Sequence, residues 1–117
     1  MIKGVEDMEQ CIYRGTTPSI TLNVKGVDLS DASVWPTVIV TVENGCRTFD
    51  VNRDKLTIAT ADAGCSVTFA LTQAQTLLMR KIQKTLVQLR AKDADGHATA
   101  TEIASVDVKD VVKDGEI

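Results

Sequence analysis

The stretch that decides the fold is LVQLRAKDADGHATATEIASVDVKDVV, residues 86–112. Two runs of alternating and β-branched residues flank its centre, Asp93-Ala94-Asp95-Gly96. Gly96 can adopt a positive φ at no steric cost, and aspartate side chains bond their own backbone in turns. The stretch therefore predicts a long β-hairpin, which we expect to form the spine of a sheet.

The two strands of this hairpin can be aligned residue by residue. With a three-residue loop and a bulge at Gly96, Asp93 faces His97. Counting back along the strands gives three further opposed pairs: Val87 with Ile103, Leu89 with Thr101, and Gln88 with Glu102.

This alignment conflicts with the apolar pattern of the second strand. Val106 and Val108 have the opposite parity to Ile103. Since one extra residue turns every later side chain to the other face, we expect a β-bulge near Ala104 or Ser105. The alternative is a central strand that is buried on both faces.

The rest of the chain consists of short strand signals separated by turns. In addition to the hairpin, the pattern predicts strands over residues 10–13, 19–24, 34–43, 47–51, 56–58 and 65–71. Asn44-Gly45 is a strong hairpin signal between two of them. The alternating apolar positions that we expect to face inward are Ile20, Leu22, Val24, Val38, Val40, Val42, Val67, Phe69 and Leu71.

One helical segment interrupts the strands, near residues 73–81. Thr72 is a good N-cap, and Gln75 at the third helical position completes a capping box. Ala74, Leu78 and Ile82 recur at four-residue spacing and predict an apolar face. We expect this short helix to cover one end of the sheets.

These elements predict an all-β protein: an antiparallel β-sandwich, immunoglobulin-like in general shape. The Cys…Trp…Cys spacing of a true immunoglobulin domain is missing, and a jelly roll or small barrel is the alternative. Residues 1–8 are expected to form a flexible lead, and residues 9–117 a single domain.

Composition excludes several classes of function. Aromatic residues make up only 3% of the 117 residues, which predicts an aliphatic core and leaves few platforms for stacking on bases or sugars. The net charge is −3 and the basic residues are scattered, so no nucleic-acid footprint is expected. We expect no membrane span and no signal peptide, and hence a cytoplasmic start. The odd set Cys11, Cys46 and Cys65 predicts free thiols that act as small hydrophobic side chains.

No motif predicts an enzyme, a cofactor or a metal. Asp50 to Asp54 copies the first five positions of an EF-hand loop, but Lys55 stands where glycine is needed and Ala61 where glutamate is needed. Asp93 and Asp95 could hold a hard cation, although carboxylates at a hairpin tip more often only form the turn. His97, the sole histidine, is expected to face solvent.

One strand face is a candidate surface for a partner. Gln88, Arg90 and Lys92 alternate along one strand, with Glu102 expected opposite Gln88. A solvated outer face with a cross-strand polar pair is the simpler interpretation. The functional alternative is a docking surface with Arg90 as its anchor, because arginine is enriched at interface hot spots. Trp35, the sole tryptophan, belongs either to the core or to this interface.

Several segments, in order, resemble a family of small proteins encoded among the tail genes of bacteriophages and prophages of Gram-positive bacteria. The resemblance extends from about residue 10 to the end, on residues 13–20 (YRGTTPSI), 71–77 (LTQAQTL), 88–91 (QLRA), 95–98 (DGHA) and 112–117 (VKDGEI). Such proteins are similar to β-sandwich modules at the N-termini of some baseplate and receptor-binding proteins. Ala74 departs from the family pattern, in which an acidic residue is expected.

The resemblance implies a non-enzymatic structural or assembly module of a tail or baseplate. Its partners would be other tail or baseplate proteins, or a second copy of the chain. It would reside in the virion or, during assembly, in the host cytoplasm. The alternative function is a small carbohydrate-binding module for host surface glycans, for which this chain offers only Tyr13, Trp35, Phe49 and Phe69 as stacking residues.

Overall fold

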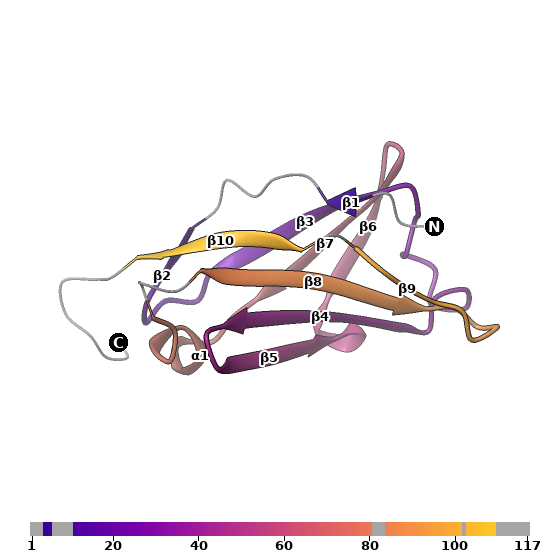
Figure 1. Ribbon diagram of the computed structural model, residues 1–117. Helices are drawn as coiled ribbons and strands as arrows, with labels where there is room; N and C mark the ends of the chain where they lie inside the picture. Colours follow the sequence, from indigo (N-terminus) through magenta and orange to yellow (C-terminus); the bar gives the residue numbers. More distant parts are fainter. Residues whose placement is uncertain (1–3, 6–10, 81–83, 102, 110–117) are drawn as a thin grey trace.

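Two β-sheets make up the protein in a computed structural model that describes residues 4–5, 11–80, 84–101 and 103–109. One sheet has the order β1-β3-β7-β6, and the other has the order β2-β10-β8-β4-β5, with β9 also paired to β8 (Figure 1). The strands are β1 (Gly4–Val5), β2 (Cys11–Tyr13), β3 (Ser19–Lys25), β4 (Thr37–Asn44), β5 (Arg47–Asn52), β6 (Thr57–Ala61), β7 (Gly64–Ala70), β8 (Thr85–Lys92), β9 (Ala98–Ala100) and β10 (Ala104–Lys109). Two short helices, η1 (Arg53–Lys55) and α1 (Gln73–Leu77), complete the described elements.

The strand order identifies the architecture. In immunoglobulin domains, strands A, B, E and D form one sheet, and G, F, C and C′ form the other. Here β1-β3-β7-β6 and β10-β8-β4-β5 follow these two orders, and β2 joins β10 in parallel. The predicted immunoglobulin-like β-sandwich is therefore confirmed.

The core between the sheets is almost entirely aliphatic, as the composition predicts. The alternating positions expected to face inward on β3, β4 and β7 are all buried, together with Leu71 just after β7. Phe69 is the one aromatic residue among the buried hydrophobic side chains of the described chain. Free Cys65 is also buried, whereas free Cys46 is exposed and does not act as a core residue.

The hairpin of β8 and β9 forms in the predicted register near its tip. The Asp93 N–H donates to the His97 carbonyl at 3.0 Å, and Gly96 has a φ of 91°. Thr101 lies opposite Leu89, because its N–H donates to the Leu89 carbonyl at 2.9 Å. The first part of the predicted alignment is confirmed.

Farther from the tip, the predicted register is wrong by one residue. Val87 pairs with Ala104 rather than with Ile103, so one extra residue lies between Thr101 and Ala104. The predicted β-bulge is therefore present, on the side of Ala104 nearer the hairpin tip. The Thr101 hydroxyl accepts the Leu89 N–H at 3.1 Å, so this side chain takes the place of a ladder carbonyl. The bulge leaves Ile103 on the surface, 59% exposed, and buries Val106. Glu102 lies outside the described residues.

The hairpin of β4 and β5 forms as predicted, but Asn44 is not a central residue of its turn. Asn44 pairs with Arg47, so Gly45 and Cys46 make the turn, with Gly45 at a φ of 62°. The Asn44 side chain is buried: Oδ1 accepts the Arg80 N–H at 2.8 Å, and Nδ2 donates to Thr85 Oγ1 at 3.0 Å. The hydrogen bonds of Asn44 thus hold the chain after α1 against the end of β4.

Helix α1 begins as predicted and ends sooner. Thr72 and Gln75 form the capping box, but the helix ends at Leu77 rather than near residue 81. Ala74 and Leu78 are exposed, and Ile82 lies outside the described residues, so the predicted apolar face is not confirmed. Thr76 and Met79 are buried instead. The helix ends because Met79 enters the core and Arg80 turns to Asn44.

The segment before β3 is bonded to α1. Arg14 donates from Nε to the Met79 carbonyl at 2.9 Å and from Nη2 to the Leu77 carbonyl at 3.0 Å. The Leu77 carbonyl is one that a helix C-terminus leaves without a partner, and a cation there is also favoured by the helix dipole. The Thr76 hydroxyl donates to the Thr16 carbonyl at 2.8 Å. Two of the segments that carry the family resemblance are therefore neighbours in space.

The N-terminal segment differs from the expected flexible lead at one point. Gly4 and Val5 form β1, which pairs with Lys25 and Val24 of β3. The extended edge of β3 provides free backbone groups for these two residues. Within the described residues, no helix is both long and apolar enough to cross a membrane.

Candidate functional site

The predicted partner face lies on the outside of the sheet that contains β8. Along β8, Val87, Leu89 and Ala91 are buried, so the residues between them point away from the core. Arg90 and Lys92 are exposed and Gln88 is half-buried. The predicted common face of these three residues is confirmed.

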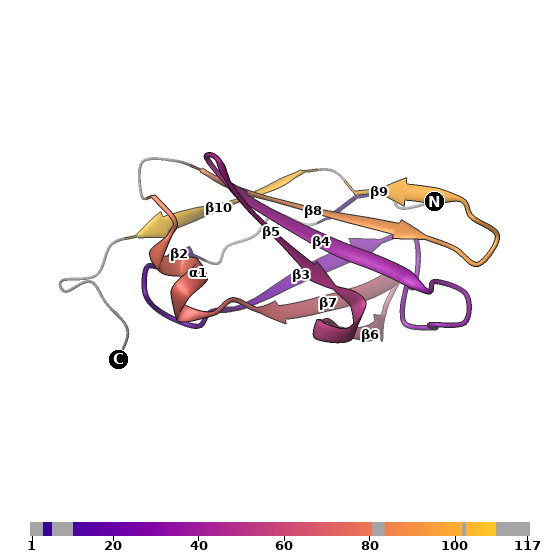
Figure 2. The same cartoon turned by 90° about the horizontal axis from the view of Figure 1, so that it is seen from below.

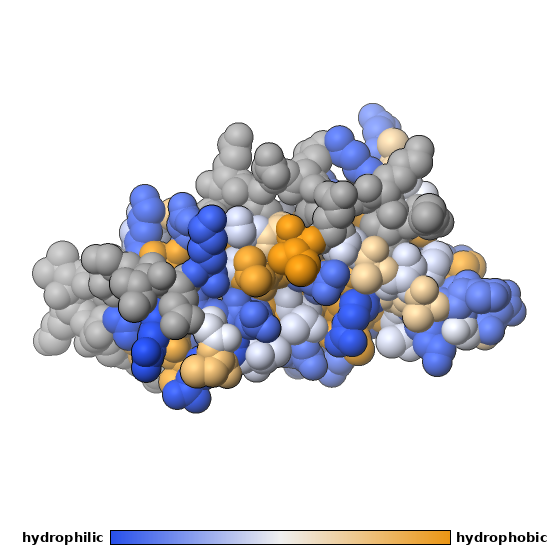
Figure 3. All heavy atoms as spheres, in the orientation of Figure 1, coloured by the Kyte–Doolittle hydropathy of each residue, from blue (hydrophilic) through white to orange (hydrophobic). Residues whose placement is uncertain are grey.

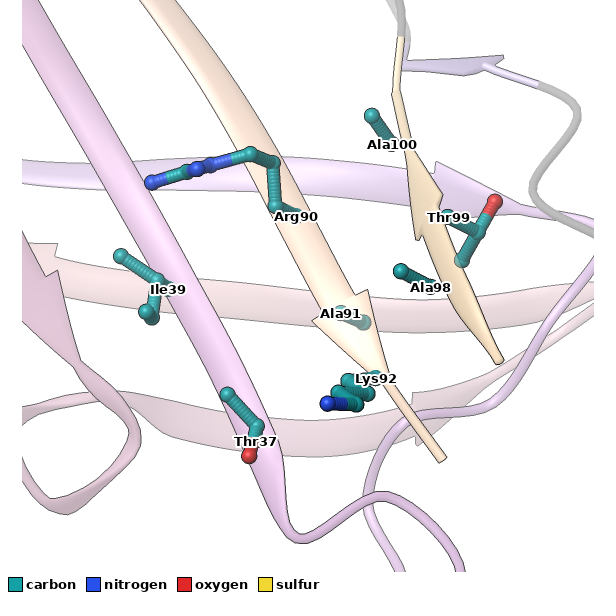
Figure 4. A pocket seen from close by; sticks show the side chains of 8 residues that line it. All are labelled: Thr37, Ile39, Arg90, Ala91, Lys92, Ala98, Thr99 and Ala100. Atoms are coloured by element: carbon teal, nitrogen blue, oxygen red, sulfur yellow. The ribbon is translucent and has the colours of Figure 1, made fainter. Parts of the chain in front are cut away.

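Short side chains on β9, on one side of β8, leave a hollow at this face. Arg90 lies between Ile39 of β4 and Ala100 of β9, and Lys92 lies between Thr37 and Ala98. The hollow has a volume of about 410 Å³ (Figure 4). Because the side chains of β9 are short, the two long cationic side chains border an open, largely apolar surface.

A chain of polar contacts orients Arg90 across the sheet. Its Nη2 lies 3.5 Å from the Thr41 Oγ1, and the Thr41 hydroxyl donates to the Asp50 Oδ1 at 2.7 Å. Figure 4 shows the Arg90 side chain extending from β8 toward β4, above Ile39. The guanidinium group is exposed, so its remaining donors can reach a carboxylate of a partner.

A second, smaller hollow continues this face along the same strands. Its volume is about 110 Å³, and its lining residues are Thr41, Glu43, Leu86, Gln88 and Ile103. Hydrophobic side chains gather near the middle of the visible surface, where β8 adjoins β10 (Figure 3). We call the residues that line the two hollows the β8 face.

The structure assembles this face only partly as predicted. Gln88, Arg90 and Lys92 belong to it, but Trp35 lines neither hollow. Trp35 is half-buried against the core, and its carbonyl accepts a bond from Arg53 Nη1 at 2.9 Å. Sequence reasoning missed the apolar members of the face, which are Ile39, Leu86, Ala91, Ala98, Ala100 and Ile103. The alternation of β4 places Ile39 outward, and the predicted hairpin register places Ala100 opposite Arg90, but neither pattern predicted that these residues border a hollow.

The carboxylate of Asp93 forms the hairpin tip, as the simpler interpretation predicts. Its Oδ1 accepts the N–H groups of Asp95 and His97, at 3.0 and 2.9 Å. The atoms of Asp93, Asp95 and His97 that could bind a metal ion lie within 4.8 Å of one another, but the hydrogen bonds within the turn account for this cluster. The His97 side chain is 83% exposed, as predicted. The backbone bond from His97 holds the pKa of Asp93 below its ordinary value.

This lowered pKa predicts how the stability gained from Asp93 depends on pH. The folded protein binds the proton more weakly than the unfolded chain, so the carboxylate stabilises the fold above its unfolded pKa, near 3.8. The gain is lost as the pH falls through the folded pKa. We expect Asp93→Asn to unfold at a lower temperature than wild type at pH 7, and the gap to narrow as the pH falls below 3.8.

Thermal unfolding over this pH range provides the measurement. Asp107→Asn, at an exposed position of β10, is the matched control and should run parallel to wild type. A gap of constant size at every pH would contradict the role of the Asp93 charge.

Aromatic side chains do not line the β8 face. Tyr13 is 45% exposed on β2, and Phe69 is buried. Phe49 and Trp35 pack against the core. Neither hollow includes any of these rings, so the β8 face lacks the usual platform for a sugar.

Comparisons with known proteins show similarity of fold only. No family model and no curated protein matches the chain. Among solved structures it is similar to murine CRIg, at 14% identity and a TM-score of 0.43, over 93% of this chain and 97% of that one. It is also similar to a titin fragment, at 17% identity and a TM-score of 0.39, over 99% of this chain and 53% of that one. Function must therefore be argued from the β8 face and from the residues themselves.

Proposed function

We propose that this protein is a non-enzymatic assembly module of a phage or prophage tail or baseplate, which acts through protein–protein contacts at the β8 face. The observation that carries the proposal is the pairing of Arg90 and Lys92 with an open, largely apolar floor. Interfaces combine an apolar centre with arginine anchors in this way.

The chemistry of the face suggests what the partner presents. Its larger hollow carries two cationic side chains and no acidic one among the residues that line it. A fitting partner segment would place an aspartate or glutamate against Arg90 and small apolar side chains over Ile39 and Ala98. Bidentate pairing with a carboxylate would give Arg90 the largest share of the specificity.

The resemblance in sequence supports the tail or baseplate as the location. Its segments include residues 88–91, which contribute Gln88 and Arg90 to the face. Other segments of the resemblance, at Arg14 and along α1, bond to each other and serve the fold. A partner surface is therefore expected at residues 88–91, and not at Arg14 and α1.

Quantitative mass spectrometry of purified particles tests the proposal, after induction of a prophage that carries this gene. We expect stoichiometric incorporation of the wild-type chain and a loss of about tenfold or more for Arg90→Glu, because reversed charge at an anchor costs several kcal/mol. Lys25→Glu reverses an exposed charge on the other sheet and should incorporate normally. Absence of the wild-type chain from particles, or equal incorporation of the three forms, would overturn the proposal.

A further inference from the structure

Strand β6 forms an open edge of the four-stranded sheet. It pairs with β7 on one side, and no other described strand lies on its second side (Figure 2). In an antiparallel pair, every second residue bonds the neighbouring strand, and the residues between direct their N–H and C=O groups to the opposite side. Part of the β6 backbone is therefore available to another strand.

The sequence of β6 lacks the features that normally protect an edge. Its five residues, Thr-Ile-Ala-Thr-Ala, include no charge, no proline and no glycine, and four of them are exposed. Natural proteins usually place lysine, proline or a bulge on such an edge to prevent pairing. The opposite sheet follows that rule, since its edge strand β5 carries Arg47 and Asp50.

The strand is also held in place before any partner arrives. The Thr60 hydroxyl donates to the Asp28 Oδ2 at 2.8 Å and lies 3.1 Å from the Ser30 hydroxyl. Leu56 and Ile58 pack against the core. Addition of a strand to this edge would therefore require little ordering of β6 itself.

We propose that β6 pairs antiparallel with β6 of a second copy of this chain, across a twofold axis at Ala59. Full overlap of the two strands places Thr57 opposite Ala61 and Ile58 opposite Thr60, with Ala59 opposite its own copy. The two four-stranded sheets then form one continuous sheet. The contact is isologous, which is the commonest symmetry of oligomers.

Charges at the ends of β6 favour a second copy in this orientation. Lys55 precedes the strand and Asp62 follows it. With the axis at Ala59, Lys55 of each copy lies opposite Ala63 of the other, one residue from Asp62, whereas parallel pairing in register would bring like charges together. This surface lies on the other sheet from the β8 face, so the inference does not depend on the proposed function.

Cysteine cross-linking tests the axis directly. In a Cys46→Ser background, which removes the exposed thiol, Ala59→Cys should form a disulfide-linked dimer under mild oxidation. Opposed residues of an antiparallel pair have Cα atoms about 4.5–5.5 Å apart, within the range of a disulfide. Thr57→Cys is the matched control and should not exceed the background, since its two copies would lie more than about 13 Å apart along the strands.

Sedimentation over a range of protein concentrations tests the same contact without oxidation. The wild-type chain should form dimers, and Ala59→Lys should weaken the dimer about tenfold or more by opposing two like charges at the axis. Thr48→Lys, on edge strand β5, should leave it unchanged. A monomer at every concentration, or equal cross-linking of the two cysteine variants, would overturn the inference. The particle assay with Arg90→Glu reports separately on the β8 face.

Discussion

Replacement of Leu89 by alanine is expected to lower the free energy of unfolding by about 2–5 kcal/mol. Leu89 is fully buried in β8, where it pairs with Val40 of β4. Its truncation removes apolar contacts and leaves a cavity that surrounding β-strands, tied by their ladders, cannot readily close. The loss would be a large part of the total stability of a domain of this size.

Urea unfolding followed by circular dichroism would measure this loss. Ile103→Ala is the matched control, because Ile103 lies just before β10 of the same sheet but is 59% exposed. We expect that control to stay within about 0.5 kcal/mol of wild type. Similar losses of stability for the two variants would mean that Leu89 is not buried in the core as described.

Replacement of Gly64 by alanine is expected to destabilise the fold by about 3 kcal/mol, near the upper end for overpacking. Gly64 begins β7 and pairs with Lys25 on one side and with Ala61 on the other. A Cβ atom at this position would overlap with the carbonyl oxygen of Val24 and lie 2.9 Å from its carbonyl carbon. Because the obstacle is backbone within a ladder, β3 and β7 would have to separate.

The same urea titration, run beside Ser66→Ala, would measure the effect. Ser66 is half-buried on β7, two residues from Gly64, and its truncation should change stability by less than about 0.5 kcal/mol. If Gly64→Ala matched this control, the close approach of β3 at Gly64 could not be correct. Glycine within a strand often marks such an approach, so this position carried a signal that sequence analysis did not use.

Local patterns determined most of the architecture. Period-two alternation in β3, β4, β7 and β8 predicted which side chains enter the core, because successive side chains of a strand point to opposite faces. Turn chemistry predicted the tip at Asp93 and Gly96, and the capping box predicted the start of α1 at Thr72. Each of these features depends on residues within a few positions of one another.

Contacts between distant residues decided the rest. The Asn44 side chain accepts a hydrogen bond from the Arg80 N–H and donates one to Thr85 Oγ1. Asn44, predicted to be a turn residue, is therefore buried, and its bond to Arg80 helps to end α1 early. Thr101 replaces a ladder carbonyl at Leu89, and this shift of the bulge brings Ile103 to the surface.

The candidate site shows the same division. The sequence by itself determined that Gln88, Arg90 and Lys92 share a face, because strand geometry requires it. Only the tertiary structure decided that Ile39 of β4 lies beside Arg90, and that β6 forms an uncharged edge. The physical reason is that alternation sets the direction of a side chain, whereas its neighbours depend on the register between strands that are far apart in the chain.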